Sequence, residues 1–313
     1  MRTLARPPFV IRRPVAALRQ QWPLAVADDV EGIHQTRVAS RRLREWVPVL
    51  APDPIPREPA ALRRRLRDVT RMLGPSRELD VAGMSLAAIA KRAPERAAAV
   101  ALVKAHVERE RARAGRVRRQ QSGTVDIEDL ATRTDRLAGL DRSPAAIRGC
   151  ATRAAARLDH RARQLQQALL GAGLVFAPGP LHRVRIALKK FRYALEVAER
   201  LGRFNLAGSL QRLKRMQNLL GDLHDLQVLA GHARDATALA PAVRRAPIDA
   251  LVGDIDATIR GLHSRFVTER GSLVAVLARA TYVRDMLETL PAPGDAKTRK
   301  GRRTSRPSRL EDR

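Results

Sequence analysis

Several features that often organise a protein are scarce in this sequence. It contains one cysteine, Cys150, so an internal disulfide is excluded and a reducing compartment suits the chain. Aromatic residues make up only 3% of it, and most of its apolar residues are good helix formers, which argues against a sheet-rich fold. The longest apolar run, residues 169–177, is interrupted by glycine and is far shorter than the roughly 18 residues that span a bilayer. We therefore expect an all-α protein without a membrane span.

Acidic residues are scarce as well. The 313 residues include 60 Lys and Arg but only 32 Asp and Glu, which gives a formal net charge of +28. A folded protein normally tolerates such self-repulsion only when an anionic partner offsets it. The apolar content of 44% is enough to build a core, so the chain is not a disordered polycation throughout. Composition thus predicts a folded protein that binds a polyanion.

Two motifs occur twice in the same order, which indicates an internal duplication. "HQTRVASRRLREWV" at residues 34–47 aligns without gaps to "HRVRIALKKFRYAL" at 182–195, and five basic positions match in register. The stretch "LRDVTRMLGPSRELDV" at 66–81 then aligns with "LKRMQNLLGDLHDLQV" at 213–228. A chance basic helix would not bring its neighbour with it, so we infer a duplicated unit of roughly 150 residues.

Each unit is predicted to contain about four helices. Gly74, followed by Pro75, is expected to end the third helix, and the fourth is expected to begin near Asp80. The stretch 122–144 is interpreted as the connection between the units. The predicted fold is two pseudo-symmetric four-helix bundles. The predicted helices span about 15–27, 30–50, 59–73, 94–121 and 144–170, and the predicted domains are 1–140 and 141–290, followed by a disordered basic tail at 291–313.

The matched basic residues form one stripe along each motif helix. Positions i, i+3, i+7 and i+10 fall within an arc of roughly 80° and span about 15 Å. A solvated surface face is the alternative for a single helix, but residues 34–44 contain no acid and stack like charges at i, i+4 spacing. Arg and Lys in this pattern favour several linked phosphates. The stripes are His34, Arg37, Arg41 and Arg44, and His182, Arg185, Lys189 and Arg192, with Arg64, Arg67 and Arg71 supporting the first and Lys214 the second.

The four motifs resemble the signatures of the CHAD family, the conserved histidine α-helical domain. The similar stretches are "HQTRVASRRLR" with "LGPSRELDV", and "LHRVRIALKKFRYALE" with "LGDLHDLQV". The resemblance covers about residues 15–290 and implies two bundles around a basic channel that binds inorganic polyphosphate. By position, it implies that the polyphosphate contacts are His34, Arg37, Arg41, Arg42, Arg44, Arg64, Arg67, Arg71, His182, Arg185, Lys189, Lys190, Arg192 and Lys214.

Two residues depart from the signatures of that family. Glu78 stands where the family usually has Asp, and His224 where it more often has Asn. We expect both to lie where helices begin, away from the stripes. Some relatives also carry a triphosphate-tunnel domain with an "ExExK" motif; the sequence lacks that motif, so we expect a stand-alone binding domain.

The sequence gives little support for an enzyme, a metal site or a cofactor. His34 and His182 have no second histidine or carboxylate at i+3 or i+4. Ser40, Ser209 and Cys150 have no recognisable nucleophile context, and no glycine-rich phosphate loop occurs. We therefore expect a protein that binds its anion without turning it over.

Other anionic partners are consistent with the same charge. A nonspecific nucleic-acid-binding protein is the main alternative, although aromatic residues for base stacking are few. A scaffold that docks on an anionic membrane or protein through the basic helix around 104–119 is a third class. The favoured interpretation is a cytoplasmic polyphosphate-binding protein associated with polyphosphate granules.

Overall fold

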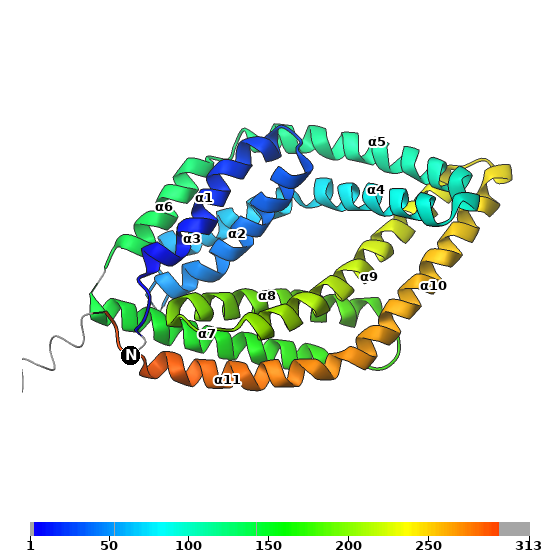
Figure 1. Cartoon of the computed structure of the whole chain (residues 1–313). Helices are drawn as coiled ribbons and strands as arrows, with labels where there is room; N and C mark the ends of the chain where they lie inside the picture. Colours follow the sequence, from blue (N-terminus) through cyan, green and yellow to red (C-terminus); the bar gives the residue numbers. More distant parts are fainter. Residues whose placement is uncertain (1–2, 53, 142, 294–313) are drawn as a thin grey trace, which may run out of the picture.

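The chain is helical throughout the part that the structure describes. The computed structural model describes residues 3–52, 54–141 and 143–293, and within these ranges it contains α-helices and short 3-10 turns but no strand, as predicted (Figure 1). None of the described helices is long and apolar enough to cross a membrane. The α-helices are α1 (Pro7–Val26), α2 (Val30–Leu50), α3 (Arg57–Met72), α4 (Gly74–Arg92), α5 (Ala97–Ser122), α6 (Ile127–Gly139), α7 (Pro144–Leu170), α8 (Pro178–Gly202), α9 (Ala207–Leu239), α10 (Arg245–Glu269) and α11 (Leu273–Thr289).

The bounds of α2 and α7 agree with the prediction, but other expectations were wrong. About four helices were expected in each unit, whereas the described part of 1–140 contains six α-helices and that of 141–290 contains five, and α1 begins at Pro7 instead of near residue 15. Gly74 begins α4 directly after α3, because Pro75 fits the first turn of a helix, where its missing N–H is not needed. The predicted connection at 122–144 contains α6, which Asp126 caps by accepting a hydrogen bond from Asp129 N at 2.8 Å. The predicted tail, residues 291–313, lies outside the described residues except for 291–293.

The two motif helices have corresponding neighbours. α2 packs against α1 and α3, and α1 also packs against α6. α8 packs against α7 and α9, and α7 also packs against α11. α2 then contacts α7 and α8, so the two sets of helices meet along the motif helices.

The remaining helices form the other end of the molecule. In Figure 1, α4 and α5 run side by side to this end, where they meet α9 and α10. α9 therefore reaches from the motif helix α8 to α4 and α5, and it joins helices from both halves of the sequence. This long helix supplies one wall of the site described below.

The contact between α1 and α2 depends on a glycine. A Cβ atom at Gly32 would lie 2.6 Å from Leu24 Cβ and 2.8 Å from the backbone nitrogen of Ala25. Real Cβ atoms do not approach backbone that closely, so a side chain here would push α1 away from α2. Gly83 of α4 offers a comparison, because a Cβ there would meet nothing within 4 Å in the described residues.

We expect Gly32→Ala to lower the free energy of unfolding by about 1–3 kcal/mol through overpacking. Gly83→Ala should leave it unchanged or raise it by up to about 1 kcal/mol, since alanine is the better helix former. Chemical denaturation of both variants measures the difference. A Gly32→Ala variant as stable as the wild type would show that α1 and α2 are not held at this distance.

Candidate functional site

A cavity of about 650 Å³ lies between the two motif helices. Its walls come from α2, α3, α4, α7, α8 and α9. The wall is rich in cations, which face one another from helices that are far apart in the sequence. These basic residues are His34, Arg37, Arg41, Arg44, Arg63, Arg77, Arg161, His182, Arg185, Lys189, Lys190 and His224.

The structure brings most of the two predicted stripes together in this cavity. Helical periodicity alone placed these side chains on one face of each helix, and the contact between α2 and α8 turns the two faces toward a shared space. The predicted residues on the cavity wall are His34, Arg37, Arg41, Arg44, His182, Arg185, Lys189 and Lys190. Those placed elsewhere are Arg42, Arg64, Arg67, Arg71, Arg192 and Lys214.

Arg42 and Arg192 bind a carboxylate beside the cavity. Arg42 Nε lies 3.0 Å from Glu196 Oε2, and Arg192 Nη1 lies 2.6 Å from Glu196 Oε1. Arg192 Nε also donates to Gln217 Oε1 at 2.7 Å. These groups join α2, α8 and α9, so the two arginines hold helices together at the flank of the cavity.

The face that α3 turns to the cavity differs from the prediction. Arg63 and Thr70 line the cavity, whereas Arg64 and Arg71 are exposed. Arg67 is half-buried and forms an ion pair with Asp68 at 3.6 Å. The register is set by α2, since the hydroxyls of Ser40 and Thr70 lie 2.8 Å apart and Arg37 Nη1 donates to the carbonyl oxygen of Thr70 at 2.6 Å. Lys214, on α9, is also exposed.

The second motif pair contributes more to the cavity than the sequence indicated. Glu78 and His224 were expected where helices begin, but both lie within helices and on the cavity wall. Arg77, next to Glu78, lines the cavity too, and the recurrence of the "LG" motifs beside the stripes is the signal that could have identified this region. Arg161 of α7 also lines it, and no motif marks that residue.

The cations of the cavity destabilise one another. Burial and the charges of Arg185 and Arg41 lower the pKa of Lys189 to about 6, although Asp225 opposes them. Burial and the charge of Arg41 lower the pKa of Arg37 to about 10, and burial with Arg185 lowers that of His224 to about 4. The positive charge of these side chains is therefore unfavourable in the folded protein, and a bound anion would stabilise it.

Several buried guanidinium nitrogens in and beside the cavity have no hydrogen-bond acceptor among the described residues. Among the described residues, the Nε atoms of Arg41, Arg44 and Arg185 are buried and have no hydrogen-bond partner in the protein. An unmet buried donor costs about 1–3 kcal/mol, and more when the group is charged. Arg185 Nη2 lies 3.9 Å from Asp225 Oδ1, which is at the limit of an ion pair. Acceptor oxygens on a bound anion would satisfy these groups.

Glu45 has a structural role at the end of the cavity. Arg157 Nε donates to Glu45 Oε2 at 2.6 Å, and Arg161 Nη2 donates to Glu45 Oε1 at 3.1 Å. Burial alone would raise the pKa of Glu45, but the two arginines hold it below its ordinary value. This buried carboxylate thus ties α2 to α7 and is not free to act as a base.

We expect Lys189→Met to raise the free energy of unfolding. Between pH 6 and pH 10 the unfolded chain keeps the lysine proton and the folded chain gives it up, so the native lysine reduces stability as the pH falls toward 6. The gain should be on the order of 1–2 kcal/mol at pH 7 and smaller at pH 9, because each pKa unit corresponds to about 1.4 kcal/mol and Lys189 is only partly shielded from solvent.

Denaturant titrations of the ligand-free protein at both pH values measure this gain. Lys91→Met is the matched control, since Lys91 is exposed on α4 and should give little change. Equal effects of Lys189→Met at pH 7 and pH 9 would contradict the electrostatic explanation.

Comparisons with known proteins agree with this architecture. PptA from Streptomyces chartreusis is 20% identical and superposes with a TM-score of 0.64 over 87% of this chain and 100% of that chain. The crystal structure of the CHAD domain from the plant Ricinus communis is 22% identical, with a TM-score of 0.55 over 93% of this chain and 94% of the other. No curated protein matches the chain. The family described as CHAD domain matches residues 10–234, which is more than half of the sequence, and the chain therefore belongs to the CHAD family.

Proposed function

We propose that the protein binds inorganic polyphosphate and holds several consecutive phosphates in the cavity between α2 and α8. The observation that carries this proposal is the set of facing cations on the cavity wall, several of which lack a carboxylate partner or have a buried donor without an acceptor. Among the described residues, Arg41 and Lys189 make no ion pair with a carboxylate. The family to which the chain belongs is linked to polyphosphate binding, which supports the same conclusion.

Linear polyphosphate fits the chemistry of the wall better than a single phosphate does. Guanidinium groups give paired hydrogen bonds to phosphate oxygens, and an ammonium group supplies a mobile point charge. The α2 stripe from His34 to Arg44 extends over about 15 Å, which matches several linked phosphates. Because the cations converge on a cavity, a flexible chain of phosphates reaches them more easily than the rigid backbone of a duplex.

An internal duplication would explain why two stripes face each other. The neighbours of α2 and of α8 correspond, since each motif helix packs against the helix before it and the helix after it. In this proposal each copy contributes one basic stripe, and the two copies close the cavity between them. The two pseudo-symmetric bundles expected from the sequence are the units of this arrangement.

Binding without cleavage is part of the proposal. Of the four carboxylates on the cavity wall, those of Glu45, Glu78, Asp222 and Asp225, Glu45 is already neutralised by two arginines and so is unsuited to activating water, and Asp225 faces Arg185 at 3.9 Å. Incubation with long-chain polyphosphate should release no orthophosphate. A protein of this kind would serve as a binding or scaffolding component of polyphosphate granules, and colocalisation of the labelled protein with granules tests that role.

We expect the double variant Arg41→Glu/Lys189→Glu to bind polyphosphate ~100-fold more weakly or worse. It removes two expected charge-assisted contacts and adds repulsion on the cavity wall. Fluorescence anisotropy with polyphosphate of tens of units measures the affinity, and circular dichroism checks the fold. Binding to the wild type should also weaken steeply with salt, as expected for contacts to several phosphates.

The matched control is Arg64→Glu/Arg71→Glu. It changes the net charge by the same amount, but both residues are exposed on α3 and lie away from the cavity, so the affinity should change only a few-fold. Equal losses in the two double variants would show diffuse binding to the surface. Displacement of polyphosphate by duplex DNA at equal phosphate concentration would favour the nucleic-acid alternative.

Binding should also be coupled to proton uptake. At pH 7.5 the free protein holds Lys189 largely neutral, because its pKa is about 6, and a neighbouring anion raises that pKa again. We expect Lys189 to contribute up to one proton of this uptake, and binding to tighten as the pH falls from 8 to 6. Calorimetry at pH 7.5 in two buffers of different ionisation enthalpy measures the uptake. Lys189→Met should reduce it, and identical heats for the wild type in both buffers would rule this coupling out.

A further inference from the structure

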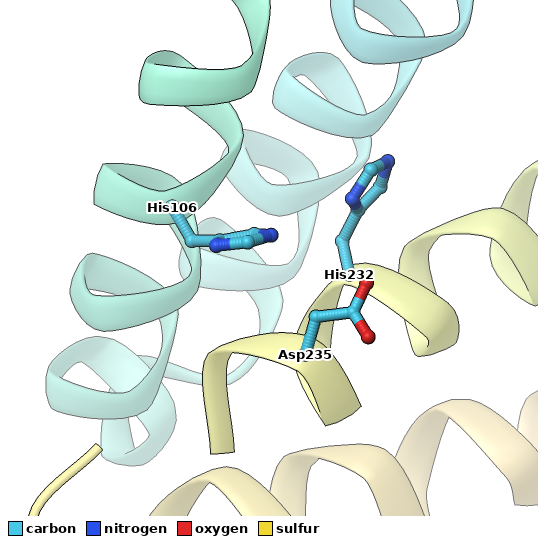
Figure 2. Close-up of side chains that lie close together, drawn as sticks. All are labelled: His106, His232 and Asp235. Carbon is cyan, nitrogen blue, oxygen red and sulfur yellow. The ribbon is translucent and has the colours of Figure 1, made fainter. Parts of the chain in front are cut away.

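Three potential metal ligands meet at the contact between α5 and α9, outside the basic cavity. His106 comes from α5, and His232 and Asp235 come from α9, as Figure 2 shows. One ligand atom of each residue lies within 4.8 Å of the others. The two imidazole rings are tilted by 52°, with centroids 5.8 Å apart. The tilt means that the rings are not simply stacked.

Among the described residues, one potential ligand atom of this cluster has no hydrogen-bond partner. His106 is buried, His232 is half-buried and Asp235 is exposed. The Nδ1 atom of His232 is buried and has no hydrogen-bond partner among the described residues. An unpaired buried imidazole nitrogen is costly unless something binds it. His232 and Asp235 are three residues apart, so they share one face of α9.

We propose that His106, His232 and Asp235 bind one divalent transition-metal ion, with Zn²⁺ as the favoured metal. This site is separate from the proposed polyphosphate cavity and goes beyond it. Two imidazole nitrogens and one carboxylate oxygen are ligands that Zn²⁺ accepts, whereas Mg²⁺ and Ca²⁺ prefer oxygen alone. A fourth, tetrahedral position would be open to water, since Asp235 lies at the surface.

The geometry requires only a small adjustment to hold the ion. Ligand atoms of a tetrahedral Zn²⁺ site lie about 3.3 Å apart, given Zn–N and Zn–O distances near 2.0–2.1 Å. The three atoms here need to close from at most 4.8 Å, which side-chain rotation can supply.

Such an ion would link the two halves of the sequence at the end remote from α7 and α11. α5 contacts both α9 and α10, and its ligand would be joined to two ligands on α9. The expectation from sequence of no metal site rested on ligands one helical turn from the motif histidines. The ligand set proposed here combines one residue of α5 with two residues of α9, and these helices are far apart in the sequence.

The test uses the full-length chain with any affinity tag removed and no polyphosphate present. We expect one Zn²⁺ per chain by calorimetry, a higher melting temperature with Zn²⁺ than with EDTA, and no such shift with Mg²⁺. His106→Ala and His232→Ala should each weaken Zn²⁺ binding on the order of 100-fold or more. His160→Ala is the control, because His160 is an exposed histidine on α7 and its loss should leave binding unchanged.

Asp235→Asn keeps the test decisive if a histidine variant fails to fold, because this residue is exposed and its substitution leaves the helix contact intact. It should weaken Zn²⁺ binding while preserving the circular dichroism spectrum. The proposal is overturned if the wild type binds no Zn²⁺, or if folded His106→Ala, His232→Ala or Asp235→Asn binds it as well as the wild type. These outcomes are independent of polyphosphate binding, which is assayed separately.

Discussion

Repulsion between the basic side chains of α2 and α8 is the constraint on which the arrangement of this protein depends. Arg41 of α2 lowers the pKa of Lys189 on α8, so the two stripes are close enough to act on each other across the cavity. Helices with such faces stay together only if the contacts on their other faces outweigh the repulsion. Those faces are apolar and buried. They include Leu43, Trp46 and Val47 of α2 and Leu188, Phe191 and Leu195 of α8.

Two carboxylates complete this balance by binding arginines beside the cavity. Glu196 holds Arg42 and Arg192, and it thereby joins α2 to α8. Glu45 holds Arg157 and Arg161, and it joins α2 to α7. A buried ion pair adds little over an apolar contact of the same size, but an unpaired partner would be strongly destabilising. The carboxylates therefore decide which arginines stay fixed in the scaffold and which cations of the wall remain available to a ligand.

Much of the cavity could be predicted because helical periodicity is a local property. The bounds of α2 follow from its apolar pattern and the prolines after it, and the i, i+3, i+7 spacing put His34, Arg37 and Arg41 on one face. The rotation of α3 could not be predicted, since it depends on the contact of Thr70 with α2. The choice of Arg63 over Arg64 follows from that contact, and charge alone does not distinguish the two. Arg161 was missed for the same reason: its position reflects how α7 packs on α2.

The two stripes differ in one respect that repulsion makes important. The aligned motifs place Lys189 where the first unit has Arg41. A guanidinium keeps its proton in a protein, so a cavity lined only by arginine would carry its full charge at all times. A lysine can lose its proton when burial and neighbours disfavour the charge, and the pKa of Lys189 is lowered to about 6. In the folded protein Lys189 therefore tends to give up its positive charge, and under the proposed function a bound polyphosphate would restore it. If the cavity binds polyphosphate as proposed, the arginines of α2 would provide permanent attraction, while the lysine of α8 would change its charge on binding.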